Sequence, residues 1–374
     1  MKIGVDTFAC NVGMSGVGVY LTQILKRIPP SGTTYELFGW EFDKFSFTDT
    51  AEKIEFISQG KITGKTANAL WHIFKFPKFA VSRKYDVCFF PAAHRRLPRK
   101  YPCSSVGTVH DMAAYWGTRK TREHLGAVLR LVLQDSLRHL DRIIAVSNWV
   151  KNELIEVAKI NESCIEVVPN GIDTSIFFPH PAESEETPVR PFGFKPPYIL
   201  YAARLHHPIK NHSTLIKAFE LFKEKTKFPH RIVFAGSDDH GADEIRAAAA
   251  ASKYRNDIFF TGNFPSNSLP GLYASASFAV FPSRYEGFGQ GALEAMATGI
   301  PVACARAAAL PETADHAALY FDPLNIEDMA DRMIALATDR ELYQKCRAAG
   351  LERSKQFSWD VCVQRTLQII QDTI

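Results

Sequence analysis

The sequence lacks the features of membrane-spanning, disulfide-rich and metal-binding proteins. No apolar run approaches the ~18 residues of a transmembrane helix. Seven cysteines are scattered among 374 residues and no two have Cys-x-x-Cys spacing, so neither a disulfide framework nor a zinc site is expected. No Asp-x-Asp pair offers carboxylates to a divalent metal. The chain enters its first strand pattern at Lys2, which leaves no room for a signal peptide. We therefore expect a cytoplasmic protein without a metal cofactor.

Positive charge is concentrated in one part of the chain. The formal net charge is only +4, but Lys61–Leu140 contains fifteen Lys or Arg residues against four acidic ones. No nucleic-acid-binding motif accompanies this region, so nucleic acid is not the expected partner. An anionic acceptor or the inner surface of a membrane fits the charge better.

One segment of this basic region, Thr66–Lys84, has the pattern of a bilayer-binding surface. Aromatic and basic side chains are interleaved along it: Trp71, Phe74, Phe76 and Phe79 with Lys75, Lys78, Arg83 and Lys84. Such an amphipathic surface suits an anionic membrane. A helix that packs on the core and leaves its lysines in solvent explains the pattern equally well. We hypothesise peripheral membrane contact, which charge reversal at Lys75, Lys78 and Lys84 would test.

Strand and helix patterns alternate through both halves of the chain, which indicates doubly wound α/β domains with parallel sheets. The length suggests two domains at ~100–200 residues each. The composition, 46% hydrophobic and 22% charged, is that of a globular protein. A segment rich in Pro, Glu and Ser predicts a linker over 181–196. We expect one Rossmann-like domain over 1–180 and a second over 197–357, facing a cleft that holds the ligand.

The predicted strands fall into two series. The first comprises Lys2–Asp6, Tyr35–Trp40, Ile54–Ser58, Val87–Phe90, Ser105–Val109 and Arg142–Val146. The second comprises Tyr198–Ala203, Arg231–Ala235, Ile258–Thr261, Ser277–Phe281 and Val302–Ala305.

A strand, a glycine turn, a helix and a further strand are predicted around Ser283–Ala305. The turn Gly287-Phe288-Gly289 frees backbone N–H groups at a helix N-terminus, where anions bind. Glu286 precedes the turn and Glu294 lies in the helix, so both could face one ligand. An ordinary surface glutamate and a first-turn glutamate favoured by the helix dipole would give the same pattern.

Two cations follow the first strand of the second domain. Arg204 and Lys210 lie in the strand-to-helix loop at the carboxyl edge of the sheet, where they could neutralise a diphosphate. A solvated pair on a loop is the alternative. Because the Glu286–Gly289 loop is expected at the same edge of the same sheet, the functional interpretation is favoured.

The first domain offers two weaker signals. His110 follows a strand at the edge where open α/β sheets bind ligands, although a lone histidine is more often structural. The glycine-rich loop that includes Gly16 and Gly18 could let a phosphate approach the backbone. Its spacing departs from Gly-x-Gly-x-x-Gly and no suitably placed acid follows, so a dinucleotide fold is not expected.

Taken together, these segments resemble the family 4 glycosyltransferases of the GT-B fold, bacterial mannosyltransferases among them. The resemblance is carried by Arg204…Lys210-Asn211, Phe234-Ala-Gly-Ser, Phe260-Thr-Gly, Pro282–Gly289 and the Glu-x7-Glu spacing of Glu286 and Glu294. His110-Asp111, Val146-Ser147, Val168–Asp173 and Phe357-Ser-Trp agree, so it spans nearly the whole chain. It implies a GT-B architecture in which the last helix, 358–374, packs back on the first domain. It also implies retaining transfer of a sugar from a nucleotide-diphosphate donor to an acceptor hydroxyl.

The resemblance assigns roles to the candidate residues. Arg204 and Lys210 would hold the donor diphosphate, Glu286 would contact the transferred hexose, and Glu294 would accept hydrogen bonds from the ribose. Backbone N–H groups of Gly287, Phe288 and Gly289 would contact the sugar hydroxyls or the phosphate. From the other domain, Gly16 and Gly18 would approach the phosphates and His110 would face the sugar. Gln290-Gly291 departs from the family, in which many members carry Leu-Pro.

The expected reaction follows from this assignment. Cleavage of a glycosyl phosphate develops negative charge on the diphosphate, which preorganised cations stabilise, so Arg204 and Lys210 could replace a metal. We expect a cofactor-free, metal-independent hexosyltransferase that uses a UDP- or GDP-hexose, with GDP-mannose favoured. A glycan or a lipid-linked acceptor of polysaccharide or lipopolysaccharide biosynthesis is expected. The two glutamates are not expected to form the carboxylate dyad of a glycosidase.

Alternatives stay open at this point. A sugar-nucleotide epimerase or a phosphorylase could share the fold, and the epimerase would act on the donor alone. A non-catalytic nucleotide-sugar-binding partner subunit is a further alternative, against which the intact set of Arg204, Lys210, Glu286 and Glu294 counts.

Overall fold

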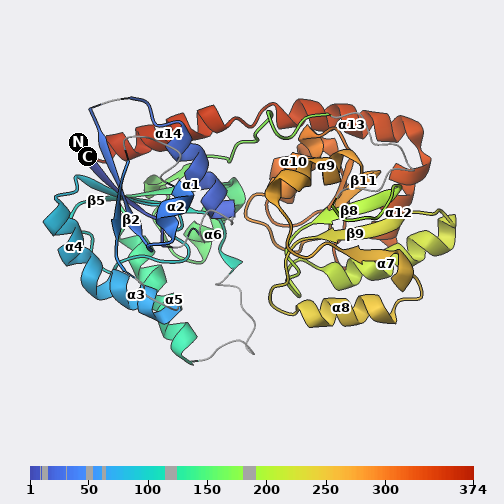
Figure 1. The fold of residues 1–374 in the computed structure, drawn as a ribbon, viewed down its shortest axis with the longest axis horizontal. Helices are drawn as coiled ribbons and strands as arrows, with labels where there is room; N and C mark the ends of the chain where they lie inside the picture. The colour runs from blue at the N-terminus through green and yellow to red at the C-terminus, as the bar shows by residue number, and fades with distance from the viewer. Residues whose placement is uncertain are drawn as a thin grey trace. The chain divides into compact units, whose positions relative to one another are not determined.

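The structure is a computed structural model that describes residues 1–8, 10, 16–30, 32–47, 54–60, 65–113, 124–179 and 191–374. The chain forms two compact units, of which the first is Met1–Gly171 with Trp359–Ile374 and the second is Ile172–Ser358 (Figure 1). Among the described residues no helix is long and apolar enough to cross a membrane.

The first unit is built on a seven-stranded parallel sheet in the order β3-β2-β1-β4-β5-β6-β7. Its strands are β1 (Lys2–Asp6), β2 (Thr34–Gly39), β3 (Glu55–Ser58), β4 (Val87–Phe90), β5 (Ser104–Val109), β6 (Arg142–Ala145) and β7 (Ile165–Val167). Its helices are α1 (Gly16–Lys26), α2 (Asp43–Phe47), α3 (Lys65–Leu70), the π-helical turn η3 (Trp71–Lys75), α4 (Phe76–Arg83), α5 (His124–Arg138), α6 (Asn148–Glu156), the 3-10 turn η6 (Glu162–Cys164) and α14 (Trp359–Asp372). The order of the strands reverses beside β1, which makes this a doubly wound fold.

The C-terminal helix α14 belongs to the core of the first unit. Its buried residues Trp359, Val363 and Ile370 share one hydrophobic cluster with residues of β1 and α1. The Tyr20 hydroxyl of α1 lies 3.4 Å from the Thr366 hydroxyl, and Arg27 Nε donates to Asp360 Oδ1 at 2.6 Å. A segment from the end of the chain therefore completes a domain made by its beginning.

The second unit repeats the same architecture with a six-stranded parallel sheet in the order β10-β9-β8-β11-β12-β13. Its strands are β8 (Tyr198–Ala202), β9 (Arg231–Ala235), β10 (Ile258–Phe260), β11 (Phe278–Phe281), β12 (Val302–Ala305) and β13 (Ala318–Phe321). Its helices are α7 (His212–Thr226), α8 (Ala242–Ala251), α9 (Leu269–Ala274), α10 (Gln290–Ala297), α11 (Leu310–Ala314), α12 (Ile326–Thr338) and α13 (Arg340–Ser354), with 3-10 turns η7 (Arg255–Asp257), η8 (Ser266–Ser268) and η9 (Asp315–Ala317).

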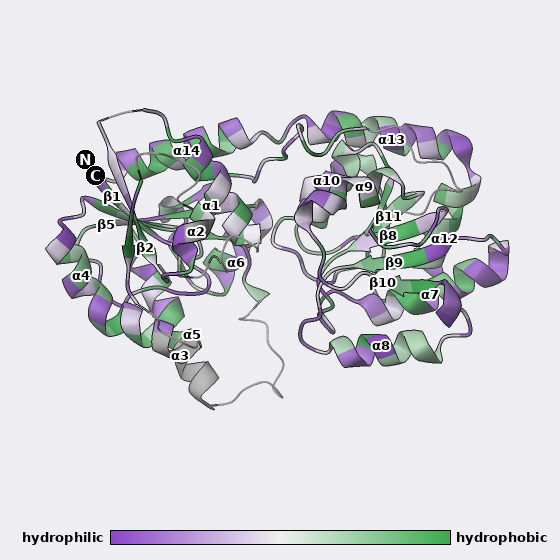
Figure 2. Ribbon diagram, in the orientation of Figure 1, coloured by the Kyte–Doolittle hydropathy of each residue, from purple (hydrophilic) through white to green (hydrophobic). Residues whose placement is uncertain are grey.

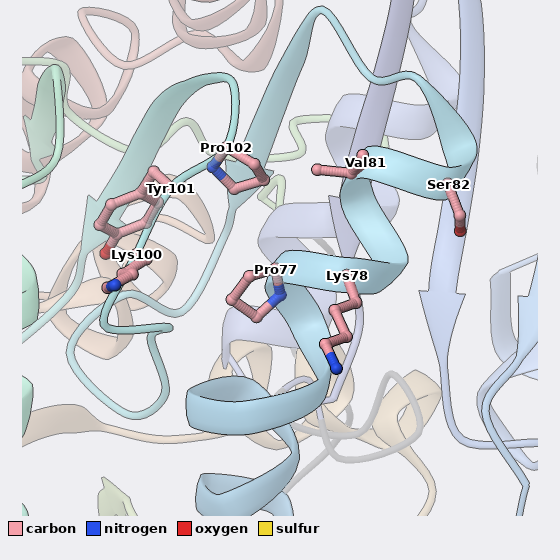
Figure 3. Close-up of a pocket in the computed structure, with 7 residues that line it drawn as sticks. All are labelled: Pro77, Lys78, Val81, Ser82, Lys100, Tyr101 and Pro102. Carbon is pink, nitrogen blue, oxygen red and sulfur yellow. The ribbon is translucent and has the colours of Figure 1, made fainter.

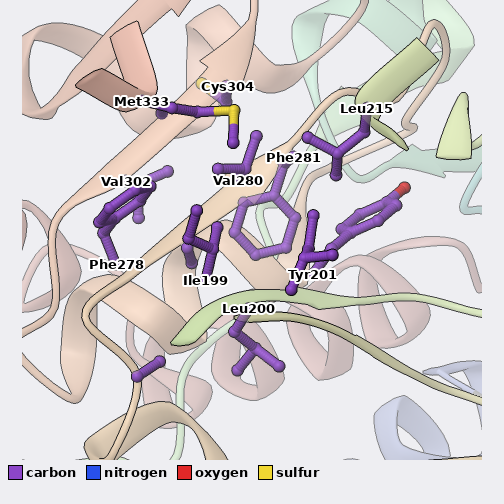
Figure 4. Packing of buried hydrophobic residues seen from close by; sticks show 14 of the residues in the cluster. Ile199, Leu200, Tyr201, Leu215, Phe278, Val280, Phe281, Val302, Cys304 and Met333 are labelled. Atoms are coloured by element: carbon purple, nitrogen blue, oxygen red, sulfur yellow. The ribbon is translucent and has the colours of Figure 1, made fainter. Parts of the chain in front are cut away.

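The central strands of the second sheet are buried on both faces. Every residue of β11 and β12 is buried, and the sequences Phe-Ala-Val-Phe and Val-Ala-Cys-Ala show no polar alternation. Parallel sheets covered by helices on both sides require such strands. Figure 4 shows Phe278, Val280 and Phe281 packed with Ile199 and Met333 in this core, and Figure 2 shows the apolar strands beside helices of mixed polarity.

The predicted fold class, two doubly wound α/β domains with parallel sheets, is confirmed. Two edge strands were missed, β7 with three residues and β13 with four. Each is too short to show a periodic pattern, and each forms because a neighbouring strand offers its free edge.

The segment expected to present aromatic side chains to a membrane is more inward-facing than the sequence suggests. Trp71 and Phe76 are buried and contact the ring of Phe38, and Phe79 packs on the same ring. Of the four aromatic residues of this segment only Phe74 is exposed. The core-packing explanation therefore holds for three of the four aromatic rings.

Candidate active site

The carboxyl ends of two adjacent strands, β8 and β11, bring together a lysine and a glutamate. Lys210 lies in the loop after β8 and Glu286 in the loop after β11, and these strands pair directly. Lys210 Nζ donates to Glu286 Oε1 at 2.6 Å. The side chains are 22% and 18% exposed, so the ion pair is shielded but still reachable by a ligand.

Buried hydroxyl groups hold this pair in place. The Ser283 hydroxyl donates to Glu286 Oε1 at 2.7 Å and lies 2.8 Å from the hydroxyl of Tyr201, which is fully buried at the end of β8. The Tyr201 hydroxyl in turn donates to the backbone carbonyl of Lys210 at 2.9 Å. Neither Tyr201 nor Ser283 stood out in the sequence, although both lie at strand ends where side chains of the site gather.

Asn211 joins the same two loops through its backbone conformation and its amide. Its φ of 59° lies in the left-handed region, which asparagine tolerates better than most residues. Its Nδ2 donates to the carbonyls of Pro282 at 3.1 Å and Pro323 at 2.8 Å. The buried amide therefore fixes where Lys210 leaves the loop and where α7 begins.

Arg204 lies at the same sheet edge but has a different partner. Its Nη1 donates to Asp239 Oδ2 at 3.0 Å, in the loop after β9, and its side chain is 60% exposed. Desolvation opposes ionisation of Asp239, but the backbone N–H of His240 and the charge of Arg204 outweigh it and lower the pKa of this carboxyl. The Arg204 side chain is thus an exposed cation paired with Asp239, whereas the Lys210 side chain is more buried.

The glycine turn places backbone groups at the N-terminus of α10. Gly289, the N-cap residue, has a φ of 98°. The ring of Phe288 is buried and packs edge-on against Phe357 at 5.6 Å, and its carbonyl accepts a hydrogen bond from Thr313. Because the Phe288 side chain is buried against Phe357, this residue can offer a ligand only its backbone.

Glu294 lies in α10 with partners separate from those of Glu286. The Tyr273 hydroxyl lies 3.4 Å from Glu294 Oε2 and 3.1 Å from the carbonyl of Gly291. Burial raises the pKa of the Glu294 carboxyl to about 8, although hydrogen bonds from Tyr273 and Gln290 oppose the shift. The two glutamates therefore do not form a proton-sharing pair, and Glu294 is largely protonated at neutral pH in the ligand-free protein.

In the first unit, His110 follows β5 at the carboxyl edge of the sheet. Its Nε2 lies 2.9 Å from the carbonyl of Pro91, which can only accept, so Nε2 carries the proton and Nδ1 is left as an acceptor. Burial and the neighbouring His94 lower the pKa of His110 to about 3. His110 is therefore a neutral hydrogen-bonding group and not an acid at physiological pH.

The two glycines predicted to approach phosphates lie in the first turn of α1. Gly16 is exposed, and a side chain there would meet no atom of the described residues within 4 Å, whereas Gly18 is buried. Residues 13–15 of the predicted glycine-rich loop lie outside the described residues. In the second unit the candidate site residues follow the strands of one sheet edge: Arg204, Lys210, Glu286, Gly287, Phe288 and Gly289 on loops, and Glu294 within α10.

A buried acid–histidine pair in the first unit went unnoticed in the sequence. Oδ2 of Asp6, the last residue of β1, lies 2.8 Å from His72 Nε2, and His72 is fully buried. Asp6 Oδ1 also accepts from the backbone N–H of Phe8. Across the described part of the chain, no group of three or more His, Cys, Asp or Glu side chains is arranged to hold a metal ion.

Two family models match the chain in succession. The model described as "Glycosyltransferase Family 4" matches residues 14–176, and the model described as "Glycosyl transferases group 1" matches residues 184–353. Together they account for most of both units.

Among curated relatives, the chain is 25% identical over 380 residues to the O-antigen chain mannosyltransferase B of Escherichia coli, with 98% of each chain covered. It is 28% identical over 243 residues to a GDP-mannose-dependent alpha-(1-6)-phosphatidylinositol monomannoside mannosyltransferase of Mycobacterium tuberculosis, with 62% of each chain covered.

Among solved structures, the fold is similar to the sucrose-phosphate synthase of Thermosynechococcus elongatus, with a TM-score of 0.77 at 18% identity over 100% of this chain and 98% of that one. It is also similar to Anabaena Alr3699/HepE in complex with UDP and glucose, with a TM-score of 0.74 at 19% identity over 99% of each chain. Identities this low indicate a shared fold only.

Proposed function

Because the chain belongs to the family 4 glycosyltransferases of the GT-B fold and is a hexosyltransferase, we propose that it transfers mannose from GDP-mannose. In this proposal the mannose is transferred to a hydroxyl group of a glycan or lipid-linked acceptor, with retention of configuration. The observation that carries this proposal is the Lys210–Glu286 pair beside the glycine turn at the N-terminus of α10. A cation, a hydrogen-bonding carboxylate and backbone N–H groups at a helix N-terminus are what a sugar diphosphate needs.

The cations act on the leaving group. As the bond between the sugar C1 and the phosphate oxygen breaks, the electron pair stays on the diphosphate, where Lys210 and Arg204 stabilise the developing charge. The acceptor oxygen forms the new bond to C1 on the same face, and its proton passes to an oxygen of the departing diphosphate. Lys210 contributes as a point charge and Arg204 through its planar fork.

The remaining residues orient the donor. In this proposal Glu286 turns from Lys210 to the hydroxyls of the transferred hexose, and the N–H groups of Gly287, Phe288 and Gly289 bind its hydroxyls or the phosphate. Glu294, once ionised, accepts from the ribose. Gly16 and Gly18 offer backbone to the phosphates, and His110 offers its neutral ring to the sugar.

The choice of donor rests on the relatives. The Escherichia coli relative is named a mannosyltransferase and the Mycobacterium tuberculosis relative is named GDP-mannose-dependent. The structural neighbour Alr3699/HepE was solved with UDP and glucose, so UDP-hexoses are the comparison arm of the test.

Three further properties belong to the same proposal. Arg204 and Lys210 take the part that a divalent metal plays elsewhere, so transfer is expected to continue in EDTA. The enzyme works in the cytoplasm, where sugar nucleotides are found. The basic surface of the first unit brings it to the inner face of the membrane, where lipid-linked acceptors are accessible.

The test combines a donor panel with two substitutions. Purified protein is incubated with GDP-mannose, UDP-glucose and UDP-galactose, with and without acceptor, and products are separated by mass. Lys210→Ala and Glu286→Ala are expected to lower turnover by at least about 100-fold, as loss of one preorganised charge in a site typically does.

The controls are matched exposed residues of the second unit, Lys217→Ala and Glu341→Ala, which should retain turnover. Near-normal turnover in Lys210→Ala or Glu286→Ala would contradict the site assignment. Conversion of the donor in the absence of any acceptor to an epimeric sugar nucleotide would contradict transferase activity itself.

A further inference from the structure

A groove on the first unit is lined by none of the residues assigned to the transfer reaction. It has a volume of about 530 Å³ and lies between α4 and the segment that leads into β5 (Figure 3). Its lining consists of Pro77, Lys78, Val81 and Ser82 from α4 and Lys100, Tyr101 and Pro102 from the facing segment.

The polar groups of the groove other than its lysines already have partners within the protein. The Tyr101 hydroxyl donates to the carbonyl of Ser136 at 3.0 Å, and its ring packs edge-on against Phe90. The Ser82 hydroxyl donates to the carbonyl of Phe79 at 2.7 Å. With Pro77, Val81 and Pro102 between them, the walls are apolar and offer few hydrogen bonds to a ligand.

The lysines at the rim give the groove its charge. Lys78 and Lys100 are exposed, and neither has a carboxylate of the described residues within ion-pair distance. Lys75, Lys84 and Arg99, which are close in sequence to the lining residues, are also exposed. Arg83, in contrast, is bound to Glu36 and contributes nothing to this surface.

Exposed apolar side chains extend the groove along the helix. Phe74 is 68% exposed and Val81 63% exposed, and with Pro77 between them they recur at intervals of three and four residues, which places them on one helical face. Large apolar side chains are unfavourable when they are this exposed to water. The cations around them would repel a basic partner. The combination is complementary to an anionic, partly apolar partner.

We propose that this groove binds an anionic phospholipid of a bilayer surface, with acyl-chain carbon against Pro77, Val81, Tyr101 and Pro102 and the phosphate between Lys78 and Lys100. A glycan is not the occupant, because its hydroxyls would find no free hydrogen-bonding partners on the apolar walls. The proposal deepens the membrane contact proposed above and names its ligand, and it is independent of which sugar nucleotide the second unit uses.

Vesicle co-sedimentation with the full-length protein tests the proposal. The probes are vesicles of phosphatidylcholine alone and vesicles in which part of it is replaced by phosphatidylglycerol. We expect binding to the anionic vesicles only. Replacing Lys78 and Lys100 by glutamine should weaken it about fivefold for each lysine, the usual contribution of a basic side chain near an anionic surface.

Two further variants separate the groove from general surface charge. Val81→Gln keeps the charge and places an amide on the apolar wall, so it should also weaken binding to anionic vesicles. Lys217→Gln with Lys345→Gln removes the same charge from exposed positions of the second unit and should leave binding unchanged. All variants should retain nucleotide binding and transfer to a soluble acceptor, so failure of this proposal is distinguishable from failure of the proposed reaction.

Several outcomes would overturn the proposal. Equal binding to neutral vesicles, or unchanged binding of the Lys78→Gln/Lys100→Gln variant, would show that these lysines recognise no anionic lipid. Unchanged binding of Val81→Gln would show a purely electrostatic surface with an empty groove. Competition by inorganic phosphate at constant ionic strength would indicate a free-phosphate site instead.

Discussion

Glu286 and Glu294, eight positions apart, lie in different environments, and the environment of each determines what it can do. Glu286 Oε1 accepts hydrogen bonds from Lys210 Nζ and from the Ser283 hydroxyl. Glu294 accepts hydrogen bonds from the uncharged side chains of Tyr273 and Gln290, and burial raises its pKa to about 8. A ribose hydroxyl could donate to the carbonyl oxygen of the protonated Glu294 carboxyl, and a second donated hydrogen bond would favour its carboxylate form.

The raised pKa of Glu294 predicts a pH-dependent penalty on stability. In the unfolded chain a glutamate ionises with a pKa near 4.3. Between that value and about 8 the native state binds the proton more tightly, so the contribution of Glu294 to stability falls as pH rises through this window. Glu294→Gln should therefore stabilise the protein more at pH 8.5 than at pH 5.5, by roughly 2 kcal/mol after a discount for its partial exposure.

Thermal unfolding of the wild type and Glu294→Gln at the two pH values provides the measurement, with the exposed Glu341→Gln as control. A stabilisation that is the same at both pH values would show that the Glu294 carboxyl is not held in its protonated form.

The sequence could predict which residues lie near each other in the candidate site, but not which side chains they contact. Residues that follow parallel strands meet at one sheet edge, so the sequence alone could indicate that Lys210 and Glu286 lie near each other. It could not indicate their partners, because the hydroxyls of Tyr201 and Ser283, 82 positions apart in the chain, come within 2.8 Å of each other only in the folded protein. Nor could it show that Arg204 lies against Asp239, a contact set by the pairing of β8 with β9.

At the scale of elements, the turn before α10 depends on one backbone conformation. Gly289 has a φ of 98°, and a Cβ added there would lie 3.1 Å from Leu310 Cδ2. Any side chain would thus have to overcome both an unfavourable backbone region and a close contact. The turn positions Glu286 on one side and α10 on the other, so strain at Gly289 would reach both glutamates.

Gly289→Ala should lower the stability of the second unit by about 1–2 kcal/mol and also lower the turnover number. The matched control is Gly193→Ala, which has a comparable φ of 76° but no atom within 4 Å of the added Cβ. Gly193→Ala should cost stability without lowering turnover, as measured by chemical unfolding and a transfer assay. If both variants retain the same turnover, the turn does not position the site.

Helix α4 and the π-helical turn before it show that a pattern of residue types does not predict the direction in which each side chain points. Alternating aromatic and basic residues indicated an amphipathic segment, but they did not indicate which aromatic rings point inward. The π-helical turn at Trp71–Lys75 and the ring of Phe38 decide this, since Trp71 and Phe76 both pack on that ring. Edge strands such as β7 were missed for a related reason: they form on contact with a neighbour and not from their own sequence.

At the scale of the whole molecule, each unit has its own hydrophobic core. The cluster around β8, β11 and β12 contains only residues of the second unit, and the cluster around β1 and α14 contains only residues of the first. The proposed donor contacts of largest charge, Lys210 and Arg204, lie in the second unit. Ligand binding and destabilising substitutions should therefore act on separate unfolding transitions.

Scanning calorimetry should resolve two transitions and assign them. Leu367→Ala, in the buried face of α14, should destabilise the first unit by about 2–5 kcal/mol and lower one transition, whereas the exposed Gln364→Ala should not. GDP at 100 times its dissociation constant should raise the other transition, since a ligand at that concentration stabilises the state that binds it by about 2.7 kcal/mol. If Leu367→Ala and GDP instead moved one common transition, the two cores would unfold as a single cooperative unit, and the C-terminal helix would couple the nucleotide site to the first domain.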